Sequence, residues 1–192
     1  MKRLLISLIV VGVASGVSLA QPEYSEAEMM VFYQRVQGFD FQSGLQGFEF
    51  QNRGFNGGGF GFVYNFKHWV GLFQQTSFLG GVEQSGLRLR MINATQGLKL
   101  TKRGLADEKL NLYVKGGIGY VHHVFSLDGS EFGDSNMSFT AGGGAEIKMK
   151  EGIWLVLDGS RMALGLPQVS LDPNRDKWDS NWVFTTGVSF QF

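Results

Sequence analysis

The sequence predicts an all-β fold, namely a single eight-stranded, antiparallel, up-and-down transmembrane β-barrel. Apolar and polar residues alternate with period two along most of the chain, which is the period of a strand that separates lipid from a polar interior. Beyond the N-terminal segment, no apolar run approaches the roughly 20 residues of a membrane-spanning helix. Long and short connections alternate strictly along the chain, so the two ends of the barrel differ.

Composition excludes several classes of protein. The 192-residue chain has the length of one domain, and it contains 28 Gly, 17 Phe and no Cys. The lack of Cys excludes disulfides, thiolate metal sites, a Cys nucleophile and a lipoprotein anchored through an N-terminal Cys. Seventeen Lys and Arg balance seventeen Asp and Glu without a basic run. We therefore expect no nucleic-acid partner.

Residues 1–20 are predicted to be a secretory signal peptide, and residues 21–192 to form the barrel domain. Lys2 and Arg3 supply a positive N-terminal region, Leu4 to Val13 supplies an apolar region, and Ser18-Leu19-Ala20 is a small-x-small cleavage site. A membrane anchor is the alternative, but the apolar stretch is short for a spanning helix.

The first four strands are expected at 29–37, 59–66, 69–78 and 92–101. In the first, we expect Met30, Phe32 and Val36 to face lipid and Arg35 to face the lumen, although Gln34 interrupts the apolar face. A helix that begins at Ser25 in a capping box is the alternative there. The third is apolar on both faces before it becomes polar. The second and fourth alternate cleanly, with these residues on the apolar faces: Phe60, Phe62, Tyr64, Phe66, Ile92, Ala94, Leu98 and Leu100.

The last four strands are expected at 110–120, 137–148, 153–164 and 181–192. The seventh places Arg161 on the same face as Leu155 and Leu157, and we expect a bulge near Gly159 to restore its parity. The other three alternate cleanly, with these residues on the apolar faces: Leu112, Val114, Ile118, Tyr120, Met137, Phe139, Ile147, Trp182, Phe184, Val188, Phe190 and Phe192.

The seven connections place both chain ends on the side of the short turns. Short turns are expected at 65–68, 102–108 and 149–152, and long outer loops at 38–54, 79–90, 126–136 and 165–180. The loop 38–54 repeats Gly and Phe, which suits either a lipid-adjacent loop or, as we favour, an extension of the first hairpin.

Charge placement decides which face meets water. A soluble barrel has the same period with its bulky residues inside. Here the small, polar faces carry few long charged side chains, and the charges gather in the proposed loops instead. Aromatic residues concentrate near both ends of the strands, as in the two girdles of a membrane barrel. We therefore expect the bulky faces to contact lipid.

Three segments resemble the small outer-membrane β-barrel family of Gram-negative bacteria. They are the terminal Phe190-Gln191-Phe192, the run from Gly59 to Phe66, and Gly116-Gly117-Ile118-Gly119-Tyr120. The resemblance implies a porin-like fold in the outer membrane, with its lipid as a partner. It also implies that Phe190 and Phe192 are the signal that the barrel-assembly machinery reads. Members of the family are functionally diverse.

Six charged residues are expected to face the lumen: Arg35, Lys99, Lys115, Glu146, Lys148 and Asp158. An eight-stranded barrel is just wide enough for side chains to fill it, and buried charges must pair. Lys115 and Glu146 lie on consecutive strands and are expected to pair. We therefore favour a lumen plugged by ion pairs. The alternative is a narrow pore for small solutes that leans toward anions, because four of the six residues are basic.

We expect no catalytic, cofactor-binding or metal-binding residues. His122 and Ser126 lie four residues apart, about 13 Å along a strand, whereas a nucleophile and its base approach within about 3 Å. Adjacent His122 and His123 point to opposite faces, so they do not share a metal ion. The spacing of Asp172, Asp176 and Asp179 matches no EF-hand. A serine from another strand leaves a lipid-modifying enzyme as a further alternative.

The function expected from the sequence is thus structural or surface-interacting and non-enzymatic. Whatever specificity exists is expected in the outer loops, and the sequence identifies no extracellular ligand.

Overall fold

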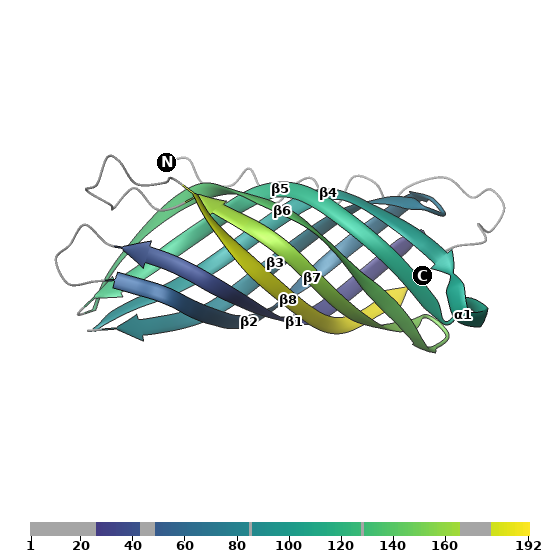
Figure 1. Ribbon diagram of the computed structural model, residues 1–192, viewed down its shortest axis with the longest axis horizontal. Coiled ribbons are helices and arrows are strands. Elements are labelled where there is room, and N and C mark those ends of the chain that lie inside the picture. The colour runs from purple at the N-terminus through teal and green to yellow at the C-terminus, as the bar shows by residue number, and fades with distance from the viewer. Residues whose placement is uncertain (1–25, 43–48, 85, 128, 166–177) are drawn as a thin grey trace.

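The computed structural model describes residues 26–42, 49–84, 86–127, 129–165 and 178–192. They form a closed antiparallel barrel in which each strand pairs with its neighbours in the sequence and the first pairs with the last (Figure 1). The predicted eight-stranded fold is confirmed. The strands are β1 (Ala27–Gln42), β2 (Glu49–Lys67), β3 (Val70–Gln84), β4 (Leu87–Gly104), β5 (Leu110–Leu127), β6 (Ser130–Lys150), β7 (Ile153–Gly165) and β8 (Trp178–Gln191).

The two ends of the barrel are unlike. At one end, here called the turn end, lie the β2–β3, β4–β5 and β6–β7 connections and the C-terminus (Figure 1). The β4–β5 connection contains α1 (Leu105–Glu108), a short turn in which Ala106, Asp107 and Glu108 have positive φ. The opposite end is here called the extended end. Among the described residues, no helix is long and apolar enough to cross a membrane.

An apolar band surrounds the barrel on its outside. On β4 it runs from Ile92 to Leu100, and on β5 from Leu112 to Tyr120, which is the length that a tilted strand needs to cross a bilayer. The expected lipid-facing sides of β2, β4, β5, β6 and β8 are confirmed. Exposed side chains of the band include Met29, Val31, Tyr33, Phe60, Phe62, Tyr64, Phe66, Leu98, Val114, Ile118, Phe139, Ile147, Leu157, Trp182 and Phe184.

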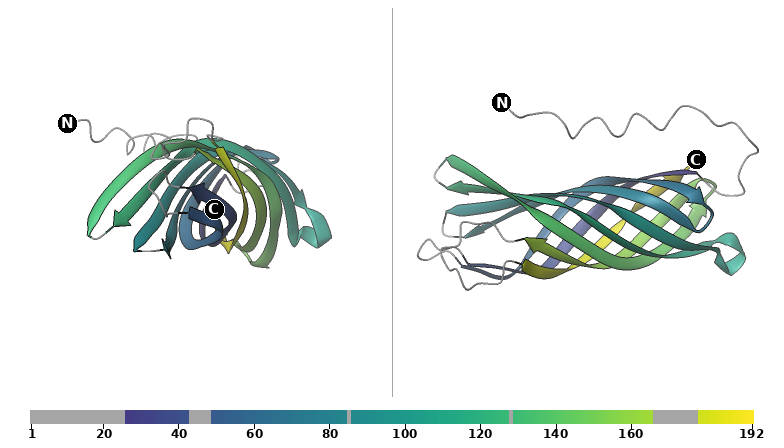
Figure 2. Two further views of the ribbon diagram at one scale, coloured as in Figure 1. Left: turned by 60° about the vertical axis from the view of Figure 1, so that its left-hand side comes forward. Right: turned by 90° about the horizontal axis from the view of Figure 1, so that it is seen from above.

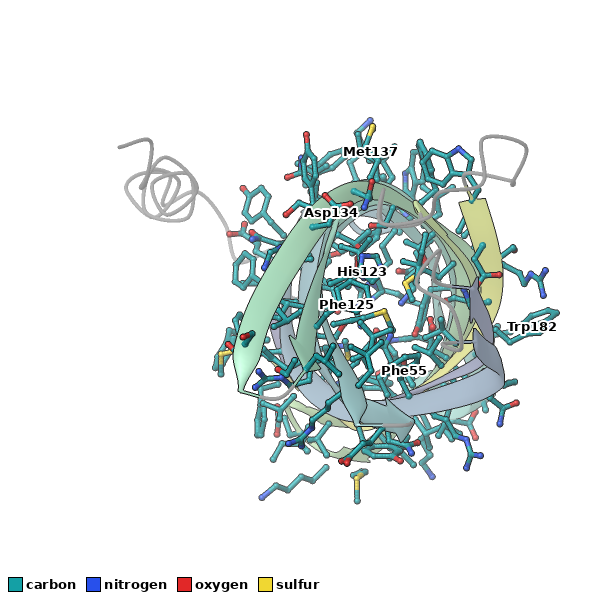
Figure 3. All side chains as sticks on the ribbon, turned by 90° about the vertical axis from the view of Figure 1, so that its left-hand side faces the viewer. Phe55, His123, Phe125, Asp134, Met137 and Trp182 are labelled. Carbon is teal, nitrogen blue, oxygen red and sulfur yellow. The ribbon has the colours of Figure 1, made fainter. Side chains whose placement is uncertain are left out.

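Beyond the band, at the extended end, the hydropathy of the strands inverts. On β4 the inward residues become apolar, with Leu87, Leu89 and Met91 buried, while Arg88 faces outward. An apolar cluster fills this end of the lumen, and Figure 3 shows two of its members, Phe55 and Phe125, pointing into the barrel. The remaining members are Val36, Leu79, Leu87, Leu89, Met91, Val121, Met162, Leu164 and Val183.

Three of the four expected long loops are strand for most of their length. The segments 79–90 and 126–136 belong to the hairpins β3–β4 and β5–β6, whose turns contain Gly86 and Gly129 at positive φ. The described parts of the segment 38–54, which are residues 38–42 and 49–54, extend the β1–β2 hairpin, as we favoured over a lipid-adjacent loop. Figure 2 shows these strands projecting past the shorter β7 and β8. The sequence analysis overestimated the length of these loops. Beyond the apolar band the strands continue with apolar residues inside the barrel and polar residues outside.

The predicted orientation of β1 is wrong. Phe32, Gln34 and Val36 face the lumen, whereas Tyr33 and Arg35 face outward. Space for the Phe32 ring explains the difference, because glycines flank it on both neighbouring strands. A Cβ on Gly59 would lie 2.5 Å from the Phe32 ring, and one on Gly187 would lie 2.7 Å from its Cβ. Glycine on β2 and β8 thus allows an aromatic side chain inside.

The bulge expected near Gly159 is also absent. The ladders of β7 with β6 and with β8 run through residue 159 without a register shift. Arg161 therefore shares the outer face with Leu157, and its guanidinium lies 4.9 Å from the centre of the Trp182 ring. An arginine can lie on the outer face when it stacks on a tryptophan at the membrane interface, so β7 needs no bulge to turn Arg161 inward.

The glycine next to Phe32 supplies a test of this packing. We expect Gly59→Ala to destabilise the barrel by about 1–3 kcal/mol, because its Cβ would lie 2.5 Å from the Phe32 ring and 2.1 Å from the Thr76 carbonyl oxygen. Gly159→Ala is the matched control, since nothing lies within 4 Å of its added Cβ. The midpoint of heat-modified gel migration compares the two. Equal midpoints would refute the packing argument.

Candidate functional site

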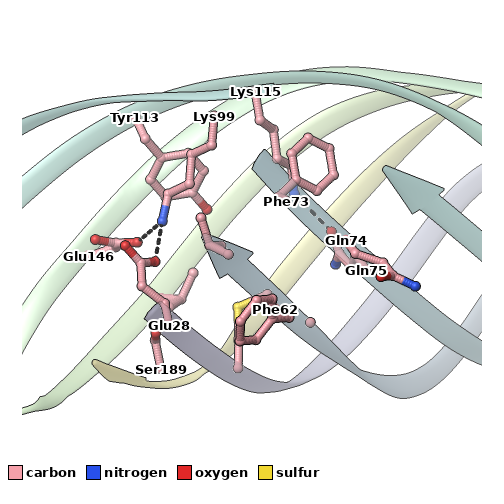
Figure 4. Close-up of a pocket in the computed structure, with 14 residues that line it drawn as sticks. Glu28, Phe62, Phe73, Gln74, Gln75, Lys99, Tyr113, Lys115, Glu146 and Ser189 are labelled. Carbon is pink, nitrogen blue, oxygen red and sulfur yellow. Dashed lines mark hydrogen bonds and ion pairs between the residues drawn. The ribbon is translucent and has the colours of Figure 1, made fainter. Parts of the chain in front are cut away.

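The buried charges of the turn end converge on Lys99 of β4 (Figure 4). Its Nζ lies 2.6 Å from Glu28 Oε2 on β1 and also contacts Glu146 Oε1 on β6. The side chains of Lys99, Glu28 and Glu146 are 6%, 2% and 1% exposed. The ammonium also lies 4.9 Å from the centre of the Tyr113 ring. One cation therefore joins carboxylates from strands on different sides of the lumen.

Further donors complete both carboxylates. Arg103 Nη2 and Asn65 Nδ2 each donate to Glu28 Oε1 at 2.8 Å. Asn111 Nδ2 donates to Glu146 Oε2 at 3.1 Å. The Arg103 Nε also donates to the His68 carbonyl oxygen at 2.9 Å, which anchors this arginine to the β2–β3 turn. A buried ion pair is stable only when its remaining hydrogen-bonding groups are satisfied, and this condition is met here.

A second ion pair lies deeper in the barrel. Lys115 Nζ is 3.1 Å from Asp158 Oδ2, and it donates to Gln75 Oε1 at 3.2 Å. Tyr113 Oη donates to Asp158 Oδ2 at 2.9 Å, and Ser160 Oγ donates to Asp158 Oδ1 at 2.6 Å. Tyr113 thus contacts both ion pairs, so the two form one continuous lumen charge network.

The network is electrically balanced and leaves little space. Three cations, Lys99, Arg103 and Lys115, face three carboxylates, which are Glu28, Glu146 and Asp158. The excess of basic groups behind the anion-leaning alternative is therefore absent from the described lumen. Both ion pairs border a cavity of about 30 Å³, which is room for one or two water molecules.

The structure places four of the six expected lumen charges in this network: Lys99, Lys115, Glu146 and Asp158. The prediction for Arg35 is wrong because β1 has the opposite parity, and this side chain is exposed on the outside. The prediction for Lys148 is also wrong. It has inward parity but lies at the open turn end, where it is exposed and 6.0 Å from the Trp154 ring.

The expected Lys115–Glu146 pair does not form. Lys115 lies opposite Gly142 in the β5–β6 ladder, whereas Glu146 lies opposite Asn111, so the two are about 13 Å apart along the strands. Sequence reasoning also missed Glu28 and Arg103, because the first strand was begun at residue 29 and residue 103 was assigned to a turn. Glu28 and Gln34 are both at even positions, and this shared parity was the sequence signal that Glu28 faces the lumen.

The histidines point to opposite faces, as expected. His123 is buried and its ring stacks 6.4 Å from Phe125, which belongs to the apolar cluster (Figure 3). His122 is exposed, and its Nδ1 lies 2.8 Å from Ser135 Oγ across the β5–β6 ladder. Ser126 instead donates to Glu131, which also pairs with Arg90. The contact of His122 with Ser135 is a histidine–serine contact between two strands, which is the arrangement that the sequence left open.

That pairing lacks an orienting carboxylate among the described residues. Asp134 accepts hydrogen bonds from the Ser135 amide and from Asn136 Nδ2. The described residues contain no group of three or more His, Asp or Glu that could hold a metal ion. Asp172 and Asp176 lie outside the described residues.

The terminal residues lie at the closure of the barrel. Phe190 is opposite Met29, and the Phe192 amide donates to the Ala27 carbonyl oxygen at 2.9 Å. The Phe192 side chain is exposed at the turn end.

Comparisons with known proteins agree with this architecture. A family model described as "Outer membrane protein beta-barrel domain" matches residues 7–192. A comparison with curated proteins found no match.

Solved outer-membrane barrels have the same fold. Neisserial surface protein A (NspA) has a TM-score of 0.69 and 8% identity, over 89% of this chain and 100% of that one. Ail of Yersinia pestis, in complex with the heparin analogue sucrose octasulfate, has a TM-score of 0.53 and 18% identity, over 87% and 99%. OprG of Pseudomonas aeruginosa has a TM-score of 0.55 and 12% identity, over 88% and 96%. At these identities the likeness shows the fold alone.

Replacement of the central lysine tests the network. We expect Lys99→Met to destabilise the barrel by about 3–5 kcal/mol, because Glu146 then remains buried without a cation. Lys148→Met is the matched control and should change stability by less than about 0.5 kcal/mol, since Lys148 is exposed. Urea unfolding in detergent micelles, followed by tryptophan fluorescence, measures both.

A rescue experiment separates lost charge from lost packing. Adding Glu146→Gln to Lys99→Met should recover part of the stability, because it removes the uncompensated carboxylate. A double variant no more stable than Lys99→Met would contradict the electrostatic account.

Proposed function

The chain belongs to the outer membrane protein β-barrel domain family, and on this premise we propose that it is a structural or surface-interaction protein of the outer membrane with a closed lumen. The single observation that carries the proposal is the filling of the interior from both ends. The lumen charge network occupies the turn end, and the apolar cluster occupies the extended end.

The proposal places the turn end in the periplasm and the extended end outside the cell. Removal of residues 1–20 then leaves a mature chain that begins at Gln21. The short turns of the turn end suit the periplasmic side, where barrels of this kind have their short connections. As the resemblance to the family implies, the proposal assigns the assembly signal to Phe190, which lies on the strand that closes the barrel against β1, and to Phe192, which follows that strand.

Charge balance at the turn end and apolar filling at the extended end support the proposal of a closed lumen. Three cations and three carboxylates satisfy one another, so none is left to attract a passing ion. An ion that leaves the network toward the extended end would pass the buried polar residues Thr95 and Asn93 and then meet the apolar cluster at Met91. An apolar constriction of this kind excludes hydrated ions at a high cost in free energy.

A surface role is supported by the continuous strand pairing of the projecting hairpins. β3–β4 and β5–β6 continue as paired strands beyond the apolar band and pack around the apolar cluster. Their outer faces carry hydrophilic side chains such as Arg90 and Glu131. A platform of this kind presents fixed polar groups to an extracellular partner without paying the entropy of ordering a loop.

Planar-bilayer recording tests the closed lumen. We expect the folded mature protein to give no steady single-channel openings, because polar and apolar barriers lie in series. A general porin reconstituted in the same way is the positive control, and heat-modified migration verifies folding of the sample. Steady openings with anion preference would instead support the narrow pore.

An assay of lipid hydrolysis tests the non-enzymatic assignment. We expect intact lipids after incubation with the folded protein, because the described residues offer His122 no orienting carboxylate. Lipid cleavage that Ser135→Ala abolishes without a loss of folding would establish the enzyme alternative.

A further inference from the structure

Two arginines on the outside of the barrel flank β8 at the extended edge of the apolar band. Arg35 of β1 lies opposite Phe184, and Arg161 of β7 lies opposite Trp182. All four side chains are exposed and point away from the lumen. Two interstrand spacings and two residues separate the arginines, which places their Cα atoms roughly 12 Å apart on one face.

Their level on the barrel corresponds to the headgroup region of a bilayer. Toward the turn end, the outward positions of the same strands are apolar, with Tyr33 and Val31 on β1 and Leu157 on β7. Toward the extended end, the next outward residue of β1 is Gln37. An outward arginine costs about 2–4 kcal/mol at the bilayer midplane and only about 0–1 kcal/mol near the interface, so this level suits both cations.

An aromatic ring contacts one of the two arginines at this level. The Arg161 guanidinium lies 4.9 Å from the centre of the Trp182 ring, which in turn stacks on Phe184 at 6.4 Å. Figure 3 shows Trp182 on the outside of the barrel wall. Stacking fixes the plane of a guanidinium and leaves its N–H groups available at the edge.

Within the described chain, neither arginine has an anionic partner. No described carboxylate lies within ion-pair distance of Arg35 or Arg161, whereas the outward Arg90 pairs with Glu131. The residue opposite Arg35 on β2 is Asn56, a neutral amide whose Oδ1 accepts a hydrogen bond from Tyr33 Oη at 2.9 Å. A pair of uncompensated, fork-shaped donors in the headgroup region is complementary to phosphate.

We propose that Arg35 and Arg161, with Trp182 and Phe184 between them, bind the phosphate groups of a glycolipid in the outer leaflet. The guanidinium groups contact phosphate while the two rings contact the adjoining part of the lipid. This inference goes beyond the proposed surface role and rests on it only for the orientation of the barrel.

Lipid binding by the folded mature protein in detergent micelles tests the proposal. The probes are purified bisphosphorylated lipid A, the same lipid after enzymatic dephosphorylation, and free inorganic phosphate. We expect tighter binding of the phosphorylated lipid than of the dephosphorylated one, and no saturable binding of free phosphate. Arg35→Gln and Arg161→Gln should each weaken binding of the phosphorylated lipid by about tenfold.

Matched variants separate this site from general surface charge. Arg88→Gln removes an exposed arginine of β4 on another part of the wall, and it should leave the affinity unchanged. The double variant Arg35→Lys/Arg161→Lys retains both charges but lacks the planar guanidinium groups. Its affinity should therefore lie between those of the wild type and of Arg35→Gln/Arg161→Gln. Heat-modified migration verifies that every variant is folded.

Equal binding of the phosphorylated and dephosphorylated lipids would overturn the proposal. An unchanged affinity in folded Arg35→Gln/Arg161→Gln, or an equal loss in Arg88→Gln, would overturn it as well. These outcomes are independent of conductance, so they leave the closed lumen standing. Conversely, a conducting barrel that still requires Arg35 and Arg161 for lipid binding would refute the closed lumen alone.

Discussion

Closure of the strand ladder is the constraint on which this structure depends. Within hydrocarbon no water satisfies backbone N–H and C=O groups, so β1 and β8 must pair along the whole of the apolar band, from Glu28–Gln191 to Gln37–Trp182. Closure with eight strands also fixes the width of the interior, which is just enough for side chains. Inward charges are therefore brought within reach of one another, and Lys99 meets Glu28 and Glu146 although 71 and 47 residues separate them in sequence.

Each long strand crosses two environments, and its hydropathy changes sign between them. On β4, Leu98 faces lipid and Lys99 faces the lumen, whereas eight residues earlier Arg90 faces outward and Leu89 is buried. The backbone geometry is the same in both parts, and only the surrounding solvent differs. A membrane barrel at one level thus continues as a water-exposed barrel with an apolar core at the next. This inversion explains why the polar stretches of 79–90 and 126–136 resemble loops in the sequence although they form hairpins.

The candidate site was predictable where alternation was clean. Lys99, Lys115 and Glu146 were assigned to the interior from cleanly alternating strands, and all three lie there, as does Asp158 from the less regular seventh strand. Arg35 was misplaced because β1 has bulky residues on both faces, and only the glycines of its neighbours make room for Phe32 inside. The identity of each partner was not predictable, because it depends on the stagger between strands. That stagger sets Lys115 opposite Gly142 and brings Asp158, rather than Glu146, to its ammonium.

The strand count, the antiparallel order and the lipid-facing sides of most strands follow from the amino-acid sequence alone. Those features are local, because side-chain period and connection length are properties of neighbouring residues. Only the tertiary structure decided the parity of β1, the outward position of Arg161 beside Trp182, the partners of the buried charges and the apolar filling of the extended end. The reason is that alternation predicts which residues of a strand share a face. The closed ladder determines whether that face points inward or outward and, through the stagger between strands, which residues lie at the same level of the barrel.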